Sequence, residues 1–185
     1  MKSSKLILAI VALACTVSIG VAFTVAYFAS LSGPVRNTFT VGHVKIALTE
    51  TSGDEYQLIP GTTIRKDPLI TVGKESEECW VYVKLERTNN LDSYVTYALE
   101  DGWTHLGGFD GVYYRLVEKS AVDKTYKVLK NDQMTVKNNI TKEKMAEINN
   151  SAYPQMKITA YAIQTLGIEN VADGWYNLMA EYGSN

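Results

Sequence analysis

The amino-acid sequence predicts an all-β protein, an antiparallel jelly-roll-like β-sandwich with short peripheral helices that follows an N-terminal signal helix. Many short segments alternate between apolar and polar residues with a period of two, and turn residues separate them. Only two short segments space their apolar residues as a helix does. No composition shift or internal repeat marks a second domain in the 185 residues. We therefore expect a signal peptide over residues 1–26 and one sandwich domain over residues 27–185.

The N-terminal segment has the residue order of an export signal. Lys2 and Lys5 precede an uncharged apolar run, and the small residues Thr24-Val25-Ala26 come at its end. Small residues three positions and one position before a cut favour cleavage after Ala26, which would make Tyr27 the new N-terminus. The alternative is an uncleaved membrane anchor, because about 20 apolar residues also span a bilayer. Contact with the membrane would then be limited to this segment.

The first expected strand covers residues 37–48, and its apolar phase changes halfway. Phe39 and Val41 occupy odd positions, whereas the apolar residues of the second half occupy even ones. Side chains alternate between the two faces of a strand, so one continuous strand would send these two groups to opposite faces. A one-residue bulge at Gly42-His43 would restore a common inward face. We therefore predict two half-strands hinged at Gly42.

The clearest strand is Cys79 to Arg87. Its odd positions up to Leu85 are apolar and are expected to face the core, which places Trp80 and Tyr82 on the opposite face. Cys79 is then a small buried apolar side chain. Further strands are expected at 94–106 and 112–119, joined by a glycine-rich hairpin loop at 107–111, and as a pair around a turn at 130–133.

The apolar period changes to that of a helix after residue 140. Thr141 is placed to cap a short helix, and a last strand is expected over residues 155–168. A second short helix is expected at 170–183, with an apolar face that can pack on a sheet. Gly174 lies inside this second helix, where glycine costs about 1 kcal/mol relative to alanine.

Composition and motifs argue against several function classes. The formal net charge is −2 and no basic cluster is present, so nucleic-acid binding is not expected. The two histidines, His43 and His105, lack the neighbouring ligands of a zinc hydrolase, and no nucleotide-binding or serine-hydrolase motif occurs. Asp101 and Asp110 lie in a glycine-rich stretch without the regular oxygen series of a calcium loop. We expect no enzyme activity, no metal and no cofactor.

Twelve Tyr and three Trp are many for this length, and some fall outside the expected core stripe. Trp80, Tyr82 and Tyr161 lie in the phase opposite to the apolar residues of their strands. Trp80, Tyr82 and Trp103 are candidates for a surface contact with a carbohydrate or a protein. The alternative, which we favour, is burial of these aromatic side chains beneath a helix on the outer face of a sheet.

Three stretches carry a family resemblance: "AYFASLSGPVRNTFTVGHVKIALTE", "LIPGTTIRKDPLITV" and "VYVKLE". They resemble Gram-positive exported proteins whose signal peptides are handled by a SipW-type signal peptidase, the group related to TasA and camelysin. The resemblance implies a jelly-roll-like antiparallel sandwich, export, and cleavage just before or within Ala26-Tyr27-Phe28. In the fibre-forming member, the freed N-terminal segment adds as a strand to the next subunit. The protease activity assigned to camelysin is not carried over, because this chain has no zinc motif.

The expected function is that of an exported structural protein, a subunit of extracellular matrix or biofilm fibres or of the cell surface of a Gram-positive bacterium. The strand donor would run from Tyr27 to Val41, with Phe28, Phe39 and Val41 as apolar residues and Gly42 as the hinge. The expected partners are further copies or related matrix subunits, and the signal peptidase. The alternative is a cell-surface module that binds a glycan or a protein without polymerising.

Overall fold

The computed structural model describes residues 30–32, 37–53, 55–148 and 153–182. The elements in chain order are β1 (Ser30–Ser32), β2 (Asn37–Val41), β3 (Ile46–Thr49), β4 (Glu55–Gln57), β5 (Thr63–Arg65), β6 (Leu69–Val72), β7 (Cys79–Arg87), α2 (Leu91–Tyr94), β8 (Val95–Thr96), β9 (Thr104–His105), β10 (Val112–Val117), β11 (Lys124–Lys127), η1 (Lys130–Asp132), β12 (Gln133–Val136), α3 (Lys142–Ala146), β13 (Met156–Gln164) and α4 (Val171–Tyr182). The fold is all-β with few short helices, as predicted. The expected signal helix, with Ala26, Tyr27 and Phe28, lies outside the described residues. Among the described helices, none is long and apolar enough to cross a membrane.

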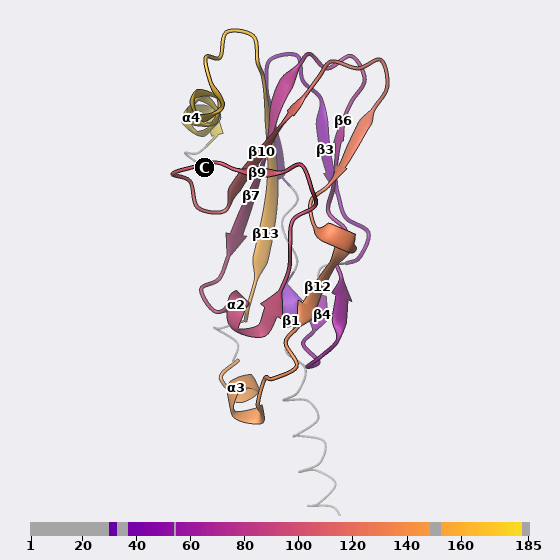
Figure 1. Cartoon of the computed structure of the whole chain (residues 1–185), viewed down its shortest axis with the longest axis vertical. Helices are drawn as coiled ribbons and strands as arrows, with labels where there is room; N and C mark the ends of the chain where they lie inside the picture. The colour runs from indigo at the N-terminus through magenta and orange to yellow at the C-terminus, as the bar shows by residue number, and fades with distance from the viewer. Residues whose placement is uncertain (1–29, 33–36, 54, 149–152, 183–185) are drawn as a thin grey trace, which may run out of the picture.

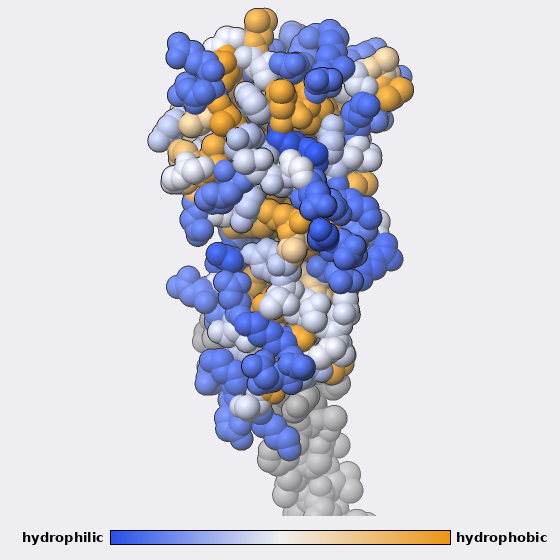
Figure 2. Space-filling view, in the orientation of Figure 1, coloured by the Kyte–Doolittle hydropathy of each residue, from blue (hydrophilic) through white to orange (hydrophobic). Residues whose placement is uncertain are grey.

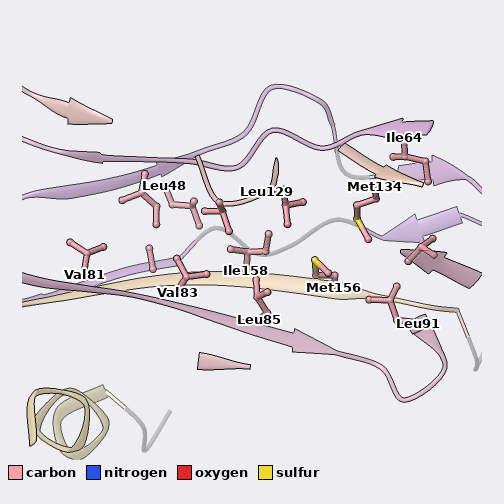
Figure 3. Packing of buried hydrophobic residues seen from close by; sticks show 14 of the residues in the cluster. Leu48, Ile64, Val81, Val83, Leu85, Leu91, Leu129, Met134, Met156 and Ile158 are labelled. Atoms are coloured by element: carbon pink, nitrogen blue, oxygen red, sulfur yellow. The ribbon is translucent and has the colours of Figure 1, made fainter. Parts of the chain in front are cut away.

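The strands form two layers that face each other across one core (Figure 1). One layer is a five-stranded sheet with the order β2-β13-β7-β10-β9, and the facing layer contains two three-stranded sheets, β11-β6-β3 and β5-β12-β8. A two-stranded ladder pairs β1 with β4. Side chains from both layers, among them Leu48, Val83 and Ile158, fill the space between the sheets (Figure 3). Seen from the side of Figure 1, the surface is mostly hydrophilic, with apolar side chains in small separate areas (Figure 2).

β7 and β13 form the centre of the five-stranded sheet. They pair antiparallel from Cys79 opposite Gln164 to Arg87 opposite Met156. β13 is buried on both faces over residues 158–163. A strand covered on both faces carries apolar or small residues at successive positions, which explains why the sequence of β13 alternates so weakly.

The chain changes layers at Gly42, and this change replaces the predicted bulge. β2 pairs parallel with β13, whereas β3 pairs antiparallel with β6 in the facing layer. Gly42 has a φ of +83°, a conformation that glycine adopts without a steric penalty. The two half-strands separated at Gly42 are confirmed. The bulge is wrong, because the apolar phase shifts where the chain leaves one sheet for another. The parallel β2–β13 pair also departs from the antiparallel pairing that the sequence predicted.

One other predicted strand and one predicted pairing are wrong. Residues 94–106 do not form one strand, because the main chain of residues 98–100 leaves to hydrogen-bond with residues 128–130. β8 therefore lies in one layer and β9 in the other. β11 and β12, expected as a pair, likewise belong to different sheets. The hairpin of β9 and β10 around the glycine-rich loop is confirmed.

The helices α3 and α4 are confirmed. The hydroxyl of Thr141 caps α3 by accepting a hydrogen bond from the backbone N–H of Lys144. α4 lies against the outer face of the five-stranded sheet, on the side away from the main core (Figures 1 and 3). A Cβ at Gly174 would lie 2.4 Å from the hydroxyl oxygen of Tyr82 in β7. The glycine that weakens the helix is therefore needed for its close approach to the sheet.

Candidate functional site

The first candidate site is the edge strand β2. The donor predicted as one strand over Tyr27–Val41 is wrong in this respect, because β1 pairs with β4 whereas β2 belongs to the five-stranded sheet. Its residues Asn37–Val41 pair with Thr159–Ile163 of β13, and Phe39 lies opposite Tyr161. Val41, the last residue of the strand, packs against the same apolar cluster as α4. Within the described residues, β2 has a strand neighbour on this one side. A single ladder and the contacts at its end therefore hold this strand in the sheet.

Contacts from two elements fix the C-terminal end of β2. The hydroxyl of Tyr182 in α4 donates to the carbonyl oxygen of Thr40 at 2.7 Å. The backbone N–H of His43 donates to the side-chain oxygen of Gln164 at 3.4 Å. A Cβ on Gly42 would lie 2.6 Å from the end of the Gln164 side chain, which would have to move, and the φ of +83° is the main reason that this turn favours glycine. The hinge predicted at Gly42 is therefore a tightly packed turn.

Departure of β2 would expose the edge of β13. The backbone N–H and C=O groups of β13 that face β2 would lose their partners, in a strand whose side chains are buried on both faces. An exposed edge of this kind accepts an extended segment from another chain. The register that holds the chain's own β2 would serve equally for the β2 of a second copy. The geometry is therefore suited to exchange of an N-terminal strand.

The candidate contact residue Tyr82 is not on the surface. It is fully buried between β7 and α4, and its hydroxyl donates to the carbonyl oxygen of Val171 at 2.7 Å. Its ring lies 5.4 Å from that of Trp175, measured between centroids. Burial raises the pKa of Tyr82, so the hydroxyl stays a neutral donor. A surface-contact role is wrong for Tyr82, and burial beneath a helix is confirmed for it and for Tyr161.

Trp80 and Trp103 are half-buried and pack against different clusters. Trp80 meets Tyr114 edge to face, with ring centroids 5.7 Å apart, in the cluster beneath α4. Trp103 packs against the main core, and its indole N–H donates to the carbonyl oxygen of Lys127 at 2.8 Å. The structure therefore does not bring Trp80, Tyr82 and Trp103 together on one surface.

The histidines and the acidic loop residues are also separate. His43 follows β2, whereas His105 lies in β9 with its ring edge-on to Tyr113. Asp101 is exposed and lies 3.3 Å from the ammonium nitrogen of Lys130. In the part of the chain that the structure describes, no three His, Cys, Asp or Glu side chains gather as they would around a metal ion. These residues do not form a common site.

A buried ion pair joins Glu50 and Lys66, two residues that sequence reasoning did not single out. Their side chains are 1% and 3% exposed, and the ammonium nitrogen lies 2.9 Å from Oε1 of the carboxylate. The hydroxyls of Ser52 and Tyr56 each donate to the same oxygen at 3.0 Å. Glu50 follows β3 and Lys66 follows β5, so the pair joins two neighbouring sheets of one layer. No periodicity links these two positions, and only the folded chain shows that they meet.

Asp67 anchors the loop that follows β3. Its carboxylate accepts hydrogen bonds from the backbone N–H groups of Thr51 and Ser52, both at 2.9 Å, and from the Thr51 hydroxyl. Burial acts to raise the pKa of Asp67, but these hydrogen bonds together outweigh it and hold the pKa well below its usual range. The stability that Asp67 contributes is therefore fully present above about pH 4, the ordinary value for the unfolded chain. It is lost as the pH falls toward the lowered pKa.

Cys79 is buried, as predicted, and we expect its thiol to be unreactive in the folded protein. Its side chain is fully inaccessible, and burial, with a smaller effect of the Glu78 carboxylate, raises the pKa of the thiol to about 12. The thiolate is the reacting species, so Ellman's reagent at pH 8 should label Cys79 at least about 100-fold more slowly than in denaturant. A Cys15→Ala variant leaves Cys79 as the single thiol for this measurement. Rapid labelling of the folded protein would contradict the burial.

Comparison with known proteins finds no family model that matches the chain, and no curated protein or solved structure with significant similarity.

Proposed function

We propose that the protein is an exported structural subunit of extracellular matrix fibres or of the cell surface, and that copies assemble by exchanging their N-terminal strands. One observation carries the proposal: β2 is a parallel edge strand that ends at the Gly42 turn and follows an export-type segment in the sequence, with only the short strand β1 described between them. Cleavage after Ala26 would free residues 27–41 from the apolar segment before them. Such a freed strand can pair with the β13 edge of another copy.

The resemblance to the TasA and camelysin group supports the same function. It implies a jelly-roll arrangement of the strands, processing by a SipW-type signal peptidase, and a location in the matrix or on the surface of a Gram-positive bacterium. The two-layer all-β fold with α3 and α4 at its periphery is compatible with that group.

Exchange of β2 would require little net free energy. Opening breaks the β2–β13 ladder and the hydrogen bond from Tyr182 to Thr40, and departure of the whole segment 27–41 also breaks the short β1–β4 ladder. Pairing with a second copy restores these contacts. The equilibrium then depends on protein concentration and on whether the N-terminus is free to leave. An uncleaved signal segment would keep the strand attached to the membrane and hold assembly back.

A disulfide across the β2–β13 ladder tests the exchange. Thr40 lies opposite Ala162, so the variant T40C/A162C, made without the native cysteines, can lock β2 in its own sheet. The oxidised protein, recovered from an expressing Gram-positive host, should form no fibres in electron micrographs. Dithiothreitol should restore them, because the reduced strand can leave.

A second disulfide provides the matched control. Thr96 lies opposite Thr135 in the facing layer, and T96C/T135C should form fibres in both redox states. Deleting residues 27–41 should leave a monomer that binds a synthetic peptide of that sequence. Fibres from the oxidised T40C/A162C variant, or polymers of the truncated protein, would refute strand exchange.

A further inference from the structure

A hollow that strand exchange does not use lies on the side of the sandwich formed by α2, β8 and the end of β7, which we call the open side. It lies where the segment between β8 and β9 crosses from one layer to the other, a connection that can be followed in Figure 1. This open-side hollow has a volume of about 410 Å³. Its walls come from the end of β7, from α2, β8 and the residues after it, from β10, and from the residue after β12. Its polar and aromatic lining includes Arg87, Asp92, Tyr97, Tyr113 and Lys137.

The lining of the open-side hollow is positively charged. Nη1 of Arg87 lies 3.1 Å from the Asp92 carboxylate and donates to the hydroxyl of Tyr97 at 3.2 Å. The ammonium group of Lys137 donates to the backbone carbonyl oxygen of Asp92 at 2.5 Å, not to a carboxylate. Two cations and one carboxylate therefore line the hollow, in a chain whose formal net charge is −2. A local positive excess of this kind attracts an anionic ligand.

Residues 96–98 separate the open-side hollow from a second, neighbouring one. Thr96, Tyr97 and Ala98 line both, and the second hollow has a volume of about 290 Å³. Its other lining residues are polar or charged: Lys130, Asn131, Gln133 and Thr135. The half-buried Tyr97 therefore stands between the two hollows. Arg87 and Lys137 line one of them, and Lys130, which forms an exposed ion pair with Asp101, lines the other.

A fourth cation, Arg115, extends this surface along β10. Arg115 is two residues from Tyr113, so both side chains lie on one face of the strand, about 7 Å apart along it. The guanidinium of Arg115 lies 5.1 Å from the ring centre of Trp103 and 4.1 Å from that of Tyr126. Within the described residues, no carboxylate pairs with it. Aromatic rings hold the cation in place and leave it able to bind an external anion.

We propose that this face binds an acidic polysaccharide, a chain of sugars that carry carboxylates. Tyr97 and Tyr113 offer aromatic surface for the C–H faces of sugar rings, and Asn131 and Gln133 offer amide groups for hydroxyls. The cations of the two hollows would bind the carboxylates through charge-assisted hydrogen bonds. Because cations line the hollows on both sides of Tyr97, an extended chain with several carboxylates can contact more of them than a single small ion can.

Other ligand classes fit this face less well. The hollows are shallow and open, and they lack the enclosed apolar pocket in which a protein partner places its anchoring side chain. The Asp92 carboxylate and the acidic chain as a whole oppose a nucleic acid, which needs a much denser array of cations.

Binding of tetragalacturonate to the full-length protein, purified in a mild detergent, tests the proposal. Titration calorimetry should detect this ligand, and neutral maltotetraose should bind at least about tenfold more weakly, because it lacks the charge-assisted hydrogen bonds. The variants K137Q and K130Q should each lower the affinity for tetragalacturonate about tenfold and leave the melting temperature unchanged. Y97L should weaken binding of both sugars, since it removes the shared aromatic surface.

The matched control is K119Q, which removes an exposed lysine that lies outside both hollows. It should leave the affinity for tetragalacturonate unchanged. The proposal would be overturned if the two sugars bound equally, or if neither bound. It would also be overturned if K119Q weakened binding of tetragalacturonate as much as K137Q and K130Q do. Equal affinity for a glutamate tetrapeptide would also overturn it, because the face would then bind anions regardless of the sugar. K137Q should still form fibres, so the sugar site and strand exchange can fail separately.

Discussion

Replacing Lys66 by methionine should lower the free energy of unfolding by about 3–5 kcal/mol, the cost of leaving one member of a buried ion pair alone. The Glu50 carboxylate lies 1% exposed, and without the ammonium group only the hydroxyls of Ser52 and Tyr56 would remain as its donors. Methionine keeps the length and apolar stem of lysine. The decrease in the free energy of unfolding would therefore come from the missing charge and not from a cavity. Chemical denaturation followed by circular dichroism measures the change.

Two further variants separate burial from charge. Glu50→Leu combined with Lys66→Met removes both charges, and it should recover most of the lost stability, because a buried pair replaced by apolar groups is often close to neutral. Lys119→Met breaks the exposed pair with Glu77 and should cost less than about 1 kcal/mol. If Lys66→Met cost no more than Lys119→Met, the pair would not be desolvated as the structure has it.

Replacing Gly174 by alanine should destabilise the protein by about 2 kcal/mol, although alanine is the better helix former by about 1 kcal/mol. The added Cβ would lie 2.4 Å from the Tyr82 hydroxyl and 3.2 Å from Cγ2 of Ile163. The Tyr82 ring is fully buried and its hydroxyl is held by the carbonyl oxygen of Val171, so it cannot move aside freely. α4 must shift outward, and the hydrogen bond to Val171 is lost. The melting temperature reports this change.

A double-mutant cycle identifies the contact responsible. Tyr82→Phe removes the hydroxyl that the new Cβ would meet, so Gly174→Ala should cost less when combined with Tyr82→Phe than in the wild type. Gly107→Ala is the matched control, because its added Cβ would meet nothing within 4 Å. A neutral or stabilising Gly174→Ala substitution would show that α4 does not pack this closely on the sheet.

Local sequence patterns were sufficient to predict those strands and helices that depend mainly on residues nearby in the sequence. The alternation in Cys79–Arg87 predicted β7 with its correct inward face, and Thr141 predicted the start of α3. Gly174 shows the limit of such reasoning: propensity marks it as a weakness, whereas packing against Tyr82 makes it a requirement.

The candidate sites were harder to predict from the sequence, because they depend on contacts between residues far apart in the chain. The phase change at Gly42 was visible in the sequence, but a bulge and a change of layer produce the same pattern of apolar residues. The aromatic residues Trp80, Tyr82 and Tyr161 were distinguishable from core residues only by strand phase, and that phase does not tell whether a helix covers the face. Tyr97 and Lys137 carried no signal at all, because they meet only where the open side brings β8 and β12 together.

Adjacent residues were enough to specify an all-β chain, a glycine turn after a first strand, a buried Cys79 and two peripheral helices, since each follows from local period and chemistry. Long-range packing was needed to pair β2 in parallel with β13, to bring Glu50 to Lys66, and to gather four cations and several aromatic rings around the two hollows. These features join residues far apart in the chain. Their positions depend on which strands become neighbours, and a periodic pattern specifies the face of a strand but not its partner.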